Sequence, residues 1–300
     1  MSSVVSVGMF DGLHLGHRAI LAAALARAAG RPCVMVTFDP HPDLVLAKRF
    51  EAMAPLTPLG EKRRRVLDAG FARMEVVPFT RELAMLTPEE FVERHLLAPL
   101  GMQALVVGAN FALGRGRAGN LERLAAIGRE RGFEVVPVPL FELDGVPVSS
   151  SLIRAHLARG EVAAAARLLG RRYDLTGRVV RGHAIGRTLG FPTANLELHE
   201  EKLVPGNGIF AVWARIGEES EARPAAMSIG VRPTFGGDTR TLEVHLLDWS
   251  GELVGREVTV EFVDWLRAER RFASSEALIE AMKDDVRETR RRLAAAAPAS

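Results

Sequence analysis

The chain has 300 residues, of which 48% are hydrophobic and 25% are charged, and its net charge at pH 7 is only +2. This length favours two domains, because one hydrophobic core rarely organises so many residues. A charge balance this close to neutral gives no global reason to expect nucleic-acid binding. No apolar run is long enough to span a bilayer, and no basic segment precedes an apolar one at the start. Neither a membrane protein nor a signal peptide is therefore expected.

The chain contains one cysteine, Cys33, which excludes an internal disulfide and is typical of a protein in the reducing cytoplasm. Cys33 adjoins an apolar run, and this position favours an inert, packed thiol. The basic residues form short groups, such as 62–65 and 290–292, which are typical of solvated helix faces. The sequence leaves open whether copies of the chain form a homo-oligomer.

Five short apolar runs recur in the first half of the chain, with helical patterns between most of them. Such continuous runs predict strands that are buried on both faces, as in a parallel sheet. A helix is expected over 18–29, with Gly30 placed to end it, and Thr87, Pro88 and Glu90 form the start signal of another. The alternation predicts a doubly wound α/β domain, in which ligands bind at the carboxyl ends of the strands. The expected strands are 4–7, 34–38, 74–77, 104–107 and 134–138.

A glycine-rich turn follows the first strand, and from Gly8 to His17 it reads Gly-Met-Phe-Asp-Gly-Leu-His-Leu-Gly-His. A strand, such a turn and a helix N-terminus form an anion site, because the helix end carries partial positive charge and unpaired N–H groups. The spacing of His14 and His17 sets two imidazoles at the mouth of that site, where they can stabilise charge on a phosphate. Alone the turn is a weak signal, since many α/β proteins need one merely to reverse the chain.

Three other segments fall at the same edge of the predicted sheet. His41 stands in a proline-stiffened loop after the second strand, and Asn110 lies in a loop rich in glycine and arginine after the fourth. Three consecutive serines, 149–151, can cap a helix expected over 152–158. Arg154 in the first turn of that helix opposes the helix dipole and therefore calls for an anion such as phosphate. Each feature alone is more often structural, but four at one edge favour a phosphate site.

Together these residues resemble the adenylyltransferase module of bacterial bifunctional riboflavin kinase/FAD synthetases, which belongs to the HxGH nucleotidylyltransferase superfamily. The resemblance covers the first 155 residues and departs at Ser151, where the family usually has threonine. It implies that His14 and His17 contact the phosphates of ATP, and that Arg154 assists at the leaving pyrophosphate. It also implies a flavin contact for His41 and Pro42. The other positions that it implies for ATP are Gly8, Phe10, Asp11, Gly12, Gly16, Asn110, Ser149, Ser150 and Ser151.

The pattern changes near Tyr173, where alternating stretches separated by turns begin. This alternation predicts a β-rich domain, a small barrel, and a helix over 275–293 is expected to close the chain. The expected domains are 1–172 and 173–293, followed by a frayed tail over 294–300. The expected strands are 175–180, 209–216, 242–247 and 258–263.

A second glycine-rich stretch runs from Gly177 and ends in Gly-Phe-Pro-Thr-Ala-Asn. Its glycines suit a flap that closes over phosphates, but a glycine-rich barrel hairpin explains them equally well. The hydroxyl of Thr193 and the amide oxygen of Asn195 are suitable ligands for Mg²⁺. Glu243 stands within an otherwise apolar strand and is a credible general base, although a glutamate on the polar face of a two-faced strand is common.

The whole stretch is similar to the signature of the riboflavin kinase family, and so are 229–235 and 266–272. The similarity implies that the threonine and the asparagine hold Mg²⁺ and ATP phosphates. It implies that Glu243 is the base for the ribityl hydroxyl. The other positions that it implies are Gly182, Gly186, Arg187 and Gly190 for ATP, and Phe191, Pro192, Arg267, Glu269 and Phe272 for the flavin.

The two resemblances imply a bifunctional enzyme that converts riboflavin and ATP to FMN, and then FMN and ATP to FAD and pyrophosphate. One alternative keeps a single activity, with the other half degenerate. Another is a flavin-binding regulatory protein that senses its ligand. Both are disfavoured because the polar positions hold competent residues, and a sensor need not keep groups that stabilise a transition state. The expected partners are riboflavin, FMN, ATP and Mg²⁺, without nucleic acid or membrane.

Overall fold

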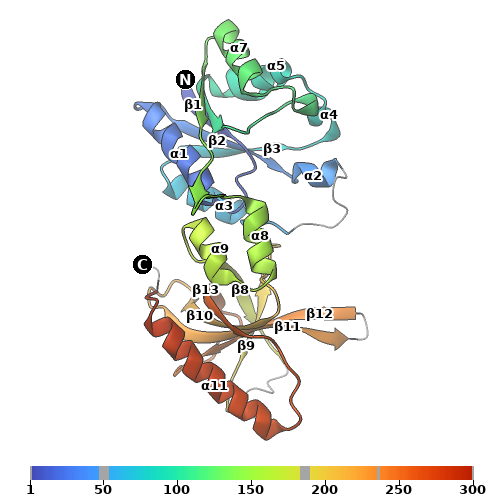
Figure 1. Cartoon of the computed structure of the whole chain (residues 1–300), viewed down its shortest axis with the longest axis vertical. Coiled ribbons are helices and arrows are strands. Elements are labelled where there is room, and N and C mark those ends of the chain that lie inside the picture. The colour runs from blue at the N-terminus through green and yellow to red at the C-terminus, as the bar shows by residue number, and fades with distance from the viewer. Residues whose placement is uncertain (1, 47–53, 183–189, 235–236, 299–300) are drawn as a thin grey trace. The chain divides into compact units, whose positions relative to one another are not determined.

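The computed structural model describes residues 2–46, 54–182, 190–234 and 237–298. Contacts within the chain divide it into two compact units, Met1–Ser150 and Ser151–Ser300. The first unit contains a five-stranded sheet flanked by helices, and the second contains a closed barrel with a long helix (Figure 1). The predicted order, an α/β part followed by a β-rich part, is confirmed.

The sheet of the first unit is parallel, and its strand order is β3-β2-β1-β4-β5. β1 (Ser3–Val7) lies at its centre between β2 (Cys33–Asp39) and β4 (Met102–Gly108). β3 (Arg73–Pro78) and β5 (Glu134–Val138) form the two edges. All five predicted strands are present. Because the chain builds outward in opposite directions from β1, the order reverses there, and this is where such sheets bind ligands.

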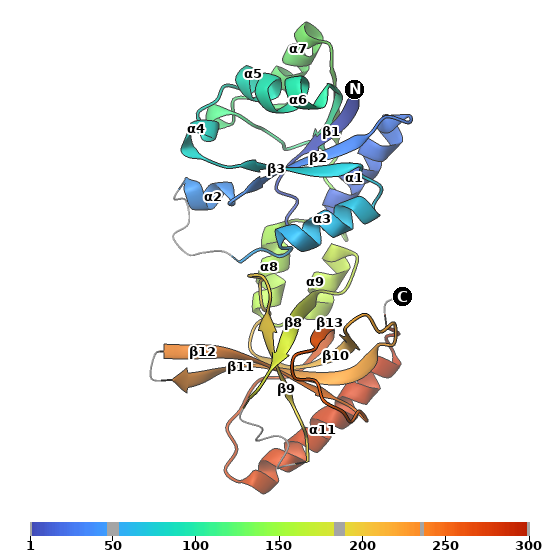
Figure 2. The same ribbon diagram turned by 180° about the vertical axis from the view of Figure 1, so that it is seen from behind.

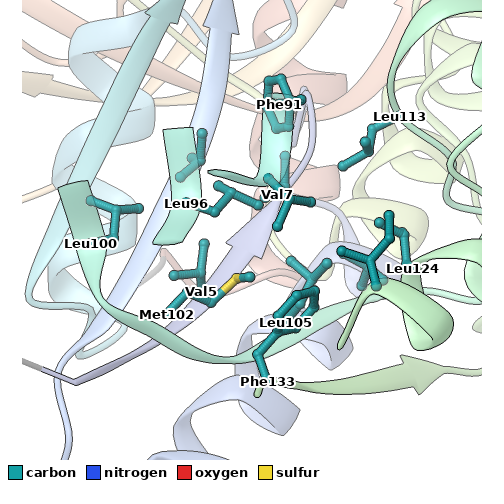
Figure 3. Close-up of a cluster of buried hydrophobic side chains, with 14 of the residues drawn as sticks. Val5, Val7, Phe91, Leu96, Leu100, Met102, Leu105, Leu113, Leu124 and Phe133 are labelled. Atoms are coloured by element: carbon teal, nitrogen blue, oxygen red, sulfur yellow. The ribbon is translucent and has the colours of Figure 1, made fainter. Parts of the chain in front are cut away.

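Two hydrophobic cores cover the two faces of this sheet. Side chains of a strand point alternately to opposite faces, so neighbouring valines of β1 enter different cores. Val5 and Val7 belong with Leu105 to the core drawn in Figure 3. Val4 and Val106 belong to the core on the other face. Burial on both faces explains why these strands appear in the sequence as continuous apolar runs.

The helices of the first unit are shared between the two cores. α1 (Leu15–Ala28) and α3 (Leu59–Asp68) contribute to one core, and α5 (Pro88–Phe91) and α7 (Leu121–Arg131) contribute to the other. Helices on both faces confirm the doubly wound arrangement, and Figure 2 shows α3 beside β3. The shorter segments are α2 (Pro42–Val45), α4 (Arg81–Ala84), α6 (Ala98–Leu100), a π-helical turn (Val92–Leu97), a 3₁₀ turn (Arg115–Arg117) and the strands β6 (Glu142–Leu143) and β7 (Val146–Pro147).

α1 begins at Leu15, earlier than the predicted start at residue 18. His14 is its N-cap residue, because the imidazole Nδ1 accepts the backbone N–H of His17 at 3.3 Å. The ring therefore does what a serine or aspartate side chain does at most helix starts, and it satisfies one of the unpaired N–H groups there. The two histidines are consequently the cap and the first turn of the helix, not part of a preceding turn.

The predicted start signal at Thr87 is confirmed. The Thr87 hydroxyl accepts the N–H of Glu90 at 3.2 Å, and the Glu90 carboxylate accepts the N–H of Thr87 at 2.9 Å. This reciprocal pair is a capping box.

The second unit is a closed antiparallel barrel with the strand order β10-β11-β12-β9-β8-β13. All four predicted strands are present, and two were missed. β9 lies in the stretch interpreted as a flap, and β11 is built from prolines, alanines and other residues of modest strand propensity. The strands are β8 (Asp174–Val180), β9 (Ala194–Leu198), β10 (Gly208–Ile216), β11 (Arg223–Thr234), β12 (Gly237–Leu246) and β13 (Glu257–Arg267).

In the described part of the second unit, three helices accompany the barrel. α8 (Ser150–Ala158) begins two positions before its predicted start, so Arg154 lies beyond the first turn, contrary to expectation. α9 (Val162–Leu169) packs against β13, and α11 (Ser275–Ala294) packs against β10, β11 and β13. The contacts therefore group α8 and α9 with the barrel, whereas the sequence places the domain boundary after them.

The tail after α11 is held to the barrel. The Trp213 indole N–H donates to the Ala296 carbonyl at 2.8 Å, and the Arg172 guanidinium donates to the Ala297 carbonyl at 2.6 Å. The segment predicted as a frayed tail from residue 294 thus supplies, in its described part, acceptors for two half-buried donors of the barrel.

Candidate functional site

The first candidate site is the loop between β1 and α1, at the point where the strand order reverses. Phe10 and Leu13 adopt left-handed backbone conformations, with φ of 48° and 43°. Such conformations cost free energy in residues other than glycine and persist where surrounding contacts impose them. Hydrogen bonds reach this loop from Thr37, from the segment 56–57, from Lys62 and from Ser150.

Asp11 is one centre of these contacts. Its Oδ1 accepts the backbone N–H groups of Leu56 at 3.0 Å and Thr57 at 3.1 Å. Its carbonyl accepts the Ser150 hydroxyl at 2.8 Å, which brings the predicted serine segment to the opening loop. The carboxylate is only 6% exposed and is engaged with backbone, so it fixes the loop.

The two imidazoles of this loop are stacked, with ring centroids 3.6 Å apart and planes 17° apart. Because Nδ1 of His14 accepts a hydrogen bond, a neutral His14 carries its proton on Nε2. Nδ1 of His17 is buried, and it has no hydrogen-bond partner among the residues that the structure describes. Burial lowers the pKa of His17 well below its ordinary value, and His14 and Lys62 act in the same direction.

Glycine at two predicted positions allows side chains to approach closely. A Cβ at Gly16 would lie 3.2 Å from the His14 ring, and a Cβ at Gly8 would lie 3.1 Å from the Phe10 ring. Either distance is shorter than carbon atoms normally reach, so these rings depend on the glycines. This gives the two glycines a physical role beside the one that the resemblance implies.

His41 and Asn110 follow β2 and β4, the two neighbours of β1, at the carboxyl edge of the sheet. Nδ1 of His41 accepts the N–H of Asp43 at 3.1 Å and caps α2, of which Pro42 is the first residue. The Asn110 carbonyl accepts the Arg117 guanidinium at 3.1 Å. Arg154 belongs by its contacts to the second unit, so its place at the histidines stays a prediction.

The second candidate site is a cavity of about 370 Å³ between α11 and the outward faces of β11 and β12. β12 alternates strictly, since Leu242 and Val244 are buried inside the barrel while Glu243 and His245 line the cavity. Glu243 therefore stands on the polar face of a two-faced strand and at the same time in a cavity. The apolar side predicted for the closing helix, which includes Met282, also lines it.

The structure brings Thr193, Asn195 and Glu243 together, as expected. The Thr193 hydroxyl donates to Oε2 of Glu243 at 3.1 Å, and Asn195 lies directly opposite Glu243 in the pairing of β9 with β12. The Asn195 amide presses so closely on Gly182 that a side chain at that glycine would overlap it. A hydroxyl, an amide and a carboxylate from distant segments thus form one cluster of oxygen donors.

The segment after β13 forms another wall of the cavity. Arg267 makes two hydrogen bonds of 2.7 Å to the Asp285 carboxylate on α11, which is 9% exposed as a residue. The Phe272 ring lies 5.7 Å from the Arg267 guanidinium. Burial raises the pKa of Glu269, and the nearby Glu243 carboxylate raises it further. The predicted flap positions Gly186 and Arg187 lie outside the described residues.

Among the lining residues that sequence reasoning missed are two titratable side chains, His245 and Asp285. Nδ1 of His245 lies 2.8 Å from the Pro192 carbonyl, and since a carbonyl only accepts, that nitrogen carries a proton. Both residues had a signal. His245 is two positions from Glu243 on the same strand face, and Asp285 interrupts the apolar side of the closing helix.

The fold and the two sites define a transferase that handles nucleotides, with one site in each unit. The FAD synthetase family matches residues 1–152, and the riboflavin kinase family matches residues 169–293. The bifunctional riboflavin kinase/FMN adenylyltransferase of Pseudomonas fluorescens is 40% identical over 300 residues, which cover 99% of this chain and 94% of that protein. The same enzyme of Escherichia coli strain K12 is 39% identical over 277 residues, which cover 92% of this chain and 88% of that protein. The chain belongs to the family of bifunctional riboflavin kinase/FMN adenylyltransferases, with the kinase in its C-terminal part and the FAD synthetase in its N-terminal part.

A solved structure resembles the whole chain. It is a crystal structure described as a macrolide-efflux protein from Streptococcus pneumoniae, which is 30% identical in sequence and has a TM-score of 0.88. The match covers 96% of this chain and 94% of the chain in that structure. In the described part of the present chain, no helix combines the length and apolar character needed to cross a membrane.

Proposed function

We propose that the loop between β1 and α1 binds ATP for the adenylylation of FMN, with His14 and His17 against its phosphates. The observation that carries the proposal is the buried Nδ1 of His17, which has no partner among the described residues. An oxygen of the FMN phosphate attacks the α-phosphorus, the bond to the β-phosphate breaks, and pyrophosphate leaves. Imidazoles and helix N–H groups offset the charge that grows on the leaving group, and Arg154 assists there.

We assign the remaining residues of this site from the segments predicted at the same edge of the sheet. Asn110 and the serines 149–151 complete the ATP site, and His41 with Pro42 faces the flavin. The contact of Ser150 with the carbonyl of Asp11 supports the first of these assignments, because it joins the serine segment to the loop.

For the kinase reaction we propose that riboflavin occupies the cavity beside α11. Glu243 takes the proton of the ribityl hydroxyl, whose oxygen attacks the γ-phosphorus of ATP, and ADP leaves. The hydrogen bond from Thr193 orients the Glu243 carboxylate, and the apolar rings of Phe191 and Phe272 suit a flat flavin. The flavin contacts are completed by Pro192, Arg267 and Glu269. The contacts to ATP are made by Gly182, Gly186, Arg187 and Gly190.

The oxygen donors around Glu243 fit Mg²⁺, which prefers hard oxygen ligands. Thr193 and Asn195 would hold the ion, and the space beside Gly182 lets the Asn195 amide reach it. A bound Mg²⁺ would supply positive charge at the phosphates of ATP. Among the described residues, no group of three or more histidine, cysteine or acidic side chains forms a metal site, which is consistent with an ion held partly by the nucleotide.

We also propose that the adenylyltransferase domain extends through 172 and the kinase domain from 173 to 293. A cytoplasmic location is supported by the single cysteine of the sequence, Cys33, which is a free thiol. The proposed ligands of the protein, riboflavin, FMN and ATP, are then small molecules of the cytoplasm.

Replacing His17 with alanine tests the first site. His17→Ala is expected to slow FAD formation from FMN and ATP by a factor on the order of 10²–10³, the usual effect of removing one transition-state contact. FMN formation from riboflavin by the same sample is the internal control and is expected to stay unchanged. Separation of the three flavins after incubation with ATP and Mg²⁺ measures both. Near-normal FAD formation would remove the loop from the mechanism.

A further inference from the structure

A buried lysine stands behind the loop between β1 and α1. Lys62 lies in the first turn of α3 and is only 4% exposed. Lysine is almost never buried to this extent without a partner, and a cation in the first turn of a helix also opposes the helix dipole. The group 62–65 was predicted to be a solvated helix face, and this is wrong for Lys62 although Arg63 and Arg64 are exposed.

The contacts of Lys62 leave much of its ammonium group available. Nζ donates to the Met9 carbonyl at 2.8 Å, and the Thr37 hydroxyl donates to the same carbonyl at 3.2 Å. Among the residues that the structure describes, this carbonyl is the one hydrogen-bond acceptor that Nζ contacts, whereas an ammonium has three N–H groups. Burial lowers the pKa of Lys62, and the carboxylates of Asp11 and Asp39 oppose that shift.

Lys62 lies close enough to His17 for its charge to lower the pKa of that imidazole. The carboxylates of Asp11 and Asp39 act on Lys62 from a distance, and Oδ1 of Asp11 accepts two backbone N–H groups. The surroundings of His17 therefore hold a buried cation whose ammonium group has one hydrogen-bond acceptor among the described residues. An anion bound at the imidazoles would be attracted by this charge.

We propose that Lys62 is a positioning residue for adenylyl transfer, which fixes the Met9 carbonyl and holds a positive charge near His17 for the polyphosphate of ATP. The inference rests on the ATP site proposed above. It separates two contributions of one side chain, a hydrogen bond that shapes the loop and a charge that attracts the leaving pyrophosphate.

Three variants separate these contributions in the full-length enzyme. Lys62→Gln keeps an N–H donor for Met9 but loses the charge, Lys62→Met loses both, and Lys62→Arg keeps the charge. Arg64→Met removes a charge from the exposed side of the same helix and is the matched control. The readouts are the KM values for ATP and FMN in FAD formation and the inhibition constant of inorganic pyrophosphate.

Lys62→Gln is expected to raise the inhibition constant of pyrophosphate about tenfold, as for the loss of one buried charge contact, and to leave the KM for FMN unchanged. Lys62→Met should in addition lower kcat, and Lys62→Arg should restore most of the pyrophosphate affinity. FMN formation measures whether each sample is intact. Pyrophosphate inhibition of Lys62→Gln equal to wild type would overturn the role of the charge. If His17→Ala forms FAD normally, the proposed ATP site itself is wrong; if only the Lys62 variants behave as wild type, this inference alone fails.

Discussion

The two proposed sites, the loop of the first unit and the cavity of the second, offer opposite kinds of side chain for phosphate chemistry. His14, His17 and Lys62 are bases gathered at the edge of a parallel sheet. Glu243 and Glu269 are carboxylates on the outside of a barrel. The acceptors explain the difference. The phosphate of FMN already carries nearly two negative charges at pH 7 and needs no base, whereas the ribityl hydroxyl of riboflavin must lose a proton.

The largest effect is expected from removing the carboxylate that we propose as the base of the kinase reaction. Glu243→Gln is expected to slow FMN formation by a factor on the order of 10²–10⁴, because the amide cannot accept the hydroxyl proton. The Thr193 hydrogen bond has an acceptor in the amide as well, so the fold should persist. FAD formation from supplied FMN should be unchanged. Loss of both reactions would show that the two sites are not independent.

The next largest effect is expected from breaking the pair between Arg267 and Asp285. Asp285→Asn leaves a largely buried guanidinium without its counter-charge, which destabilises the barrel by about 3 kcal/mol. The KM for riboflavin should also rise, because Arg267 lines the cavity. Urea unfolding and riboflavin titration measure the two effects. Asp284→Asn, on the exposed face of the same helix, is the control and should change neither.

A smaller, paired effect is expected at two glycines, one in each site. Gly16→Ala places a methyl group against the His14 ring, and Gly182→Ala places one on the Asn195 amide. Overpacking of this kind costs about 1–3 kcal/mol of stability. Because it also displaces the His14 ring or the Asn195 amide, each variant should slow its own reaction about tenfold. Gly16→Ala should impair FAD formation alone, and Gly182→Ala FMN formation alone. A crossed result would contradict the assignment of the sites.

The smallest effect is expected on the pH dependence of folding stability, and it concerns only the first site. In the unfolded chain His17 binds its proton near the ordinary pKa of 6.5, but in the folded unit burial lowers that pKa. Between the two values the unfolded state holds more protons, so stability falls as the pH falls through this window. His17→Asn should make thermal unfolding of the ligand-free protein less sensitive to pH there. An unchanged slope would show that other groups dominate.

Sequence patterns predicted most of the fold where burial leaves a clear signature. The continuous runs of β1 to β5 and the alternation of β8, β10, β12 and β13 each correspond to a strand. β11 was missed because its register with β10 and β12, not its own composition, makes it a strand. The start of α1 was misplaced because an imidazole seldom serves as an N-cap.

The candidate sites were predicted less evenly. Thr193, Asn195 and Glu243 were named from short motifs, and the structure brings them together. Lys62 and Asp285 were missed because their importance depends on which side of a helix faces the interior. In a run of basic residues such as 62–65, nothing local distinguishes the one that is buried.

The contacts of the C-terminal tail have a consequence for variation in this part of the chain. Trp213 and Arg172 bind the carbonyls of Ala296 and Ala297, and a carbonyl is present whatever the side chain. The anchoring is therefore indifferent to residue identity but sensitive to length. Substitutions in this segment should be tolerated freely, while a deletion that draws the carbonyls away from the two donors should loosen the end of α11.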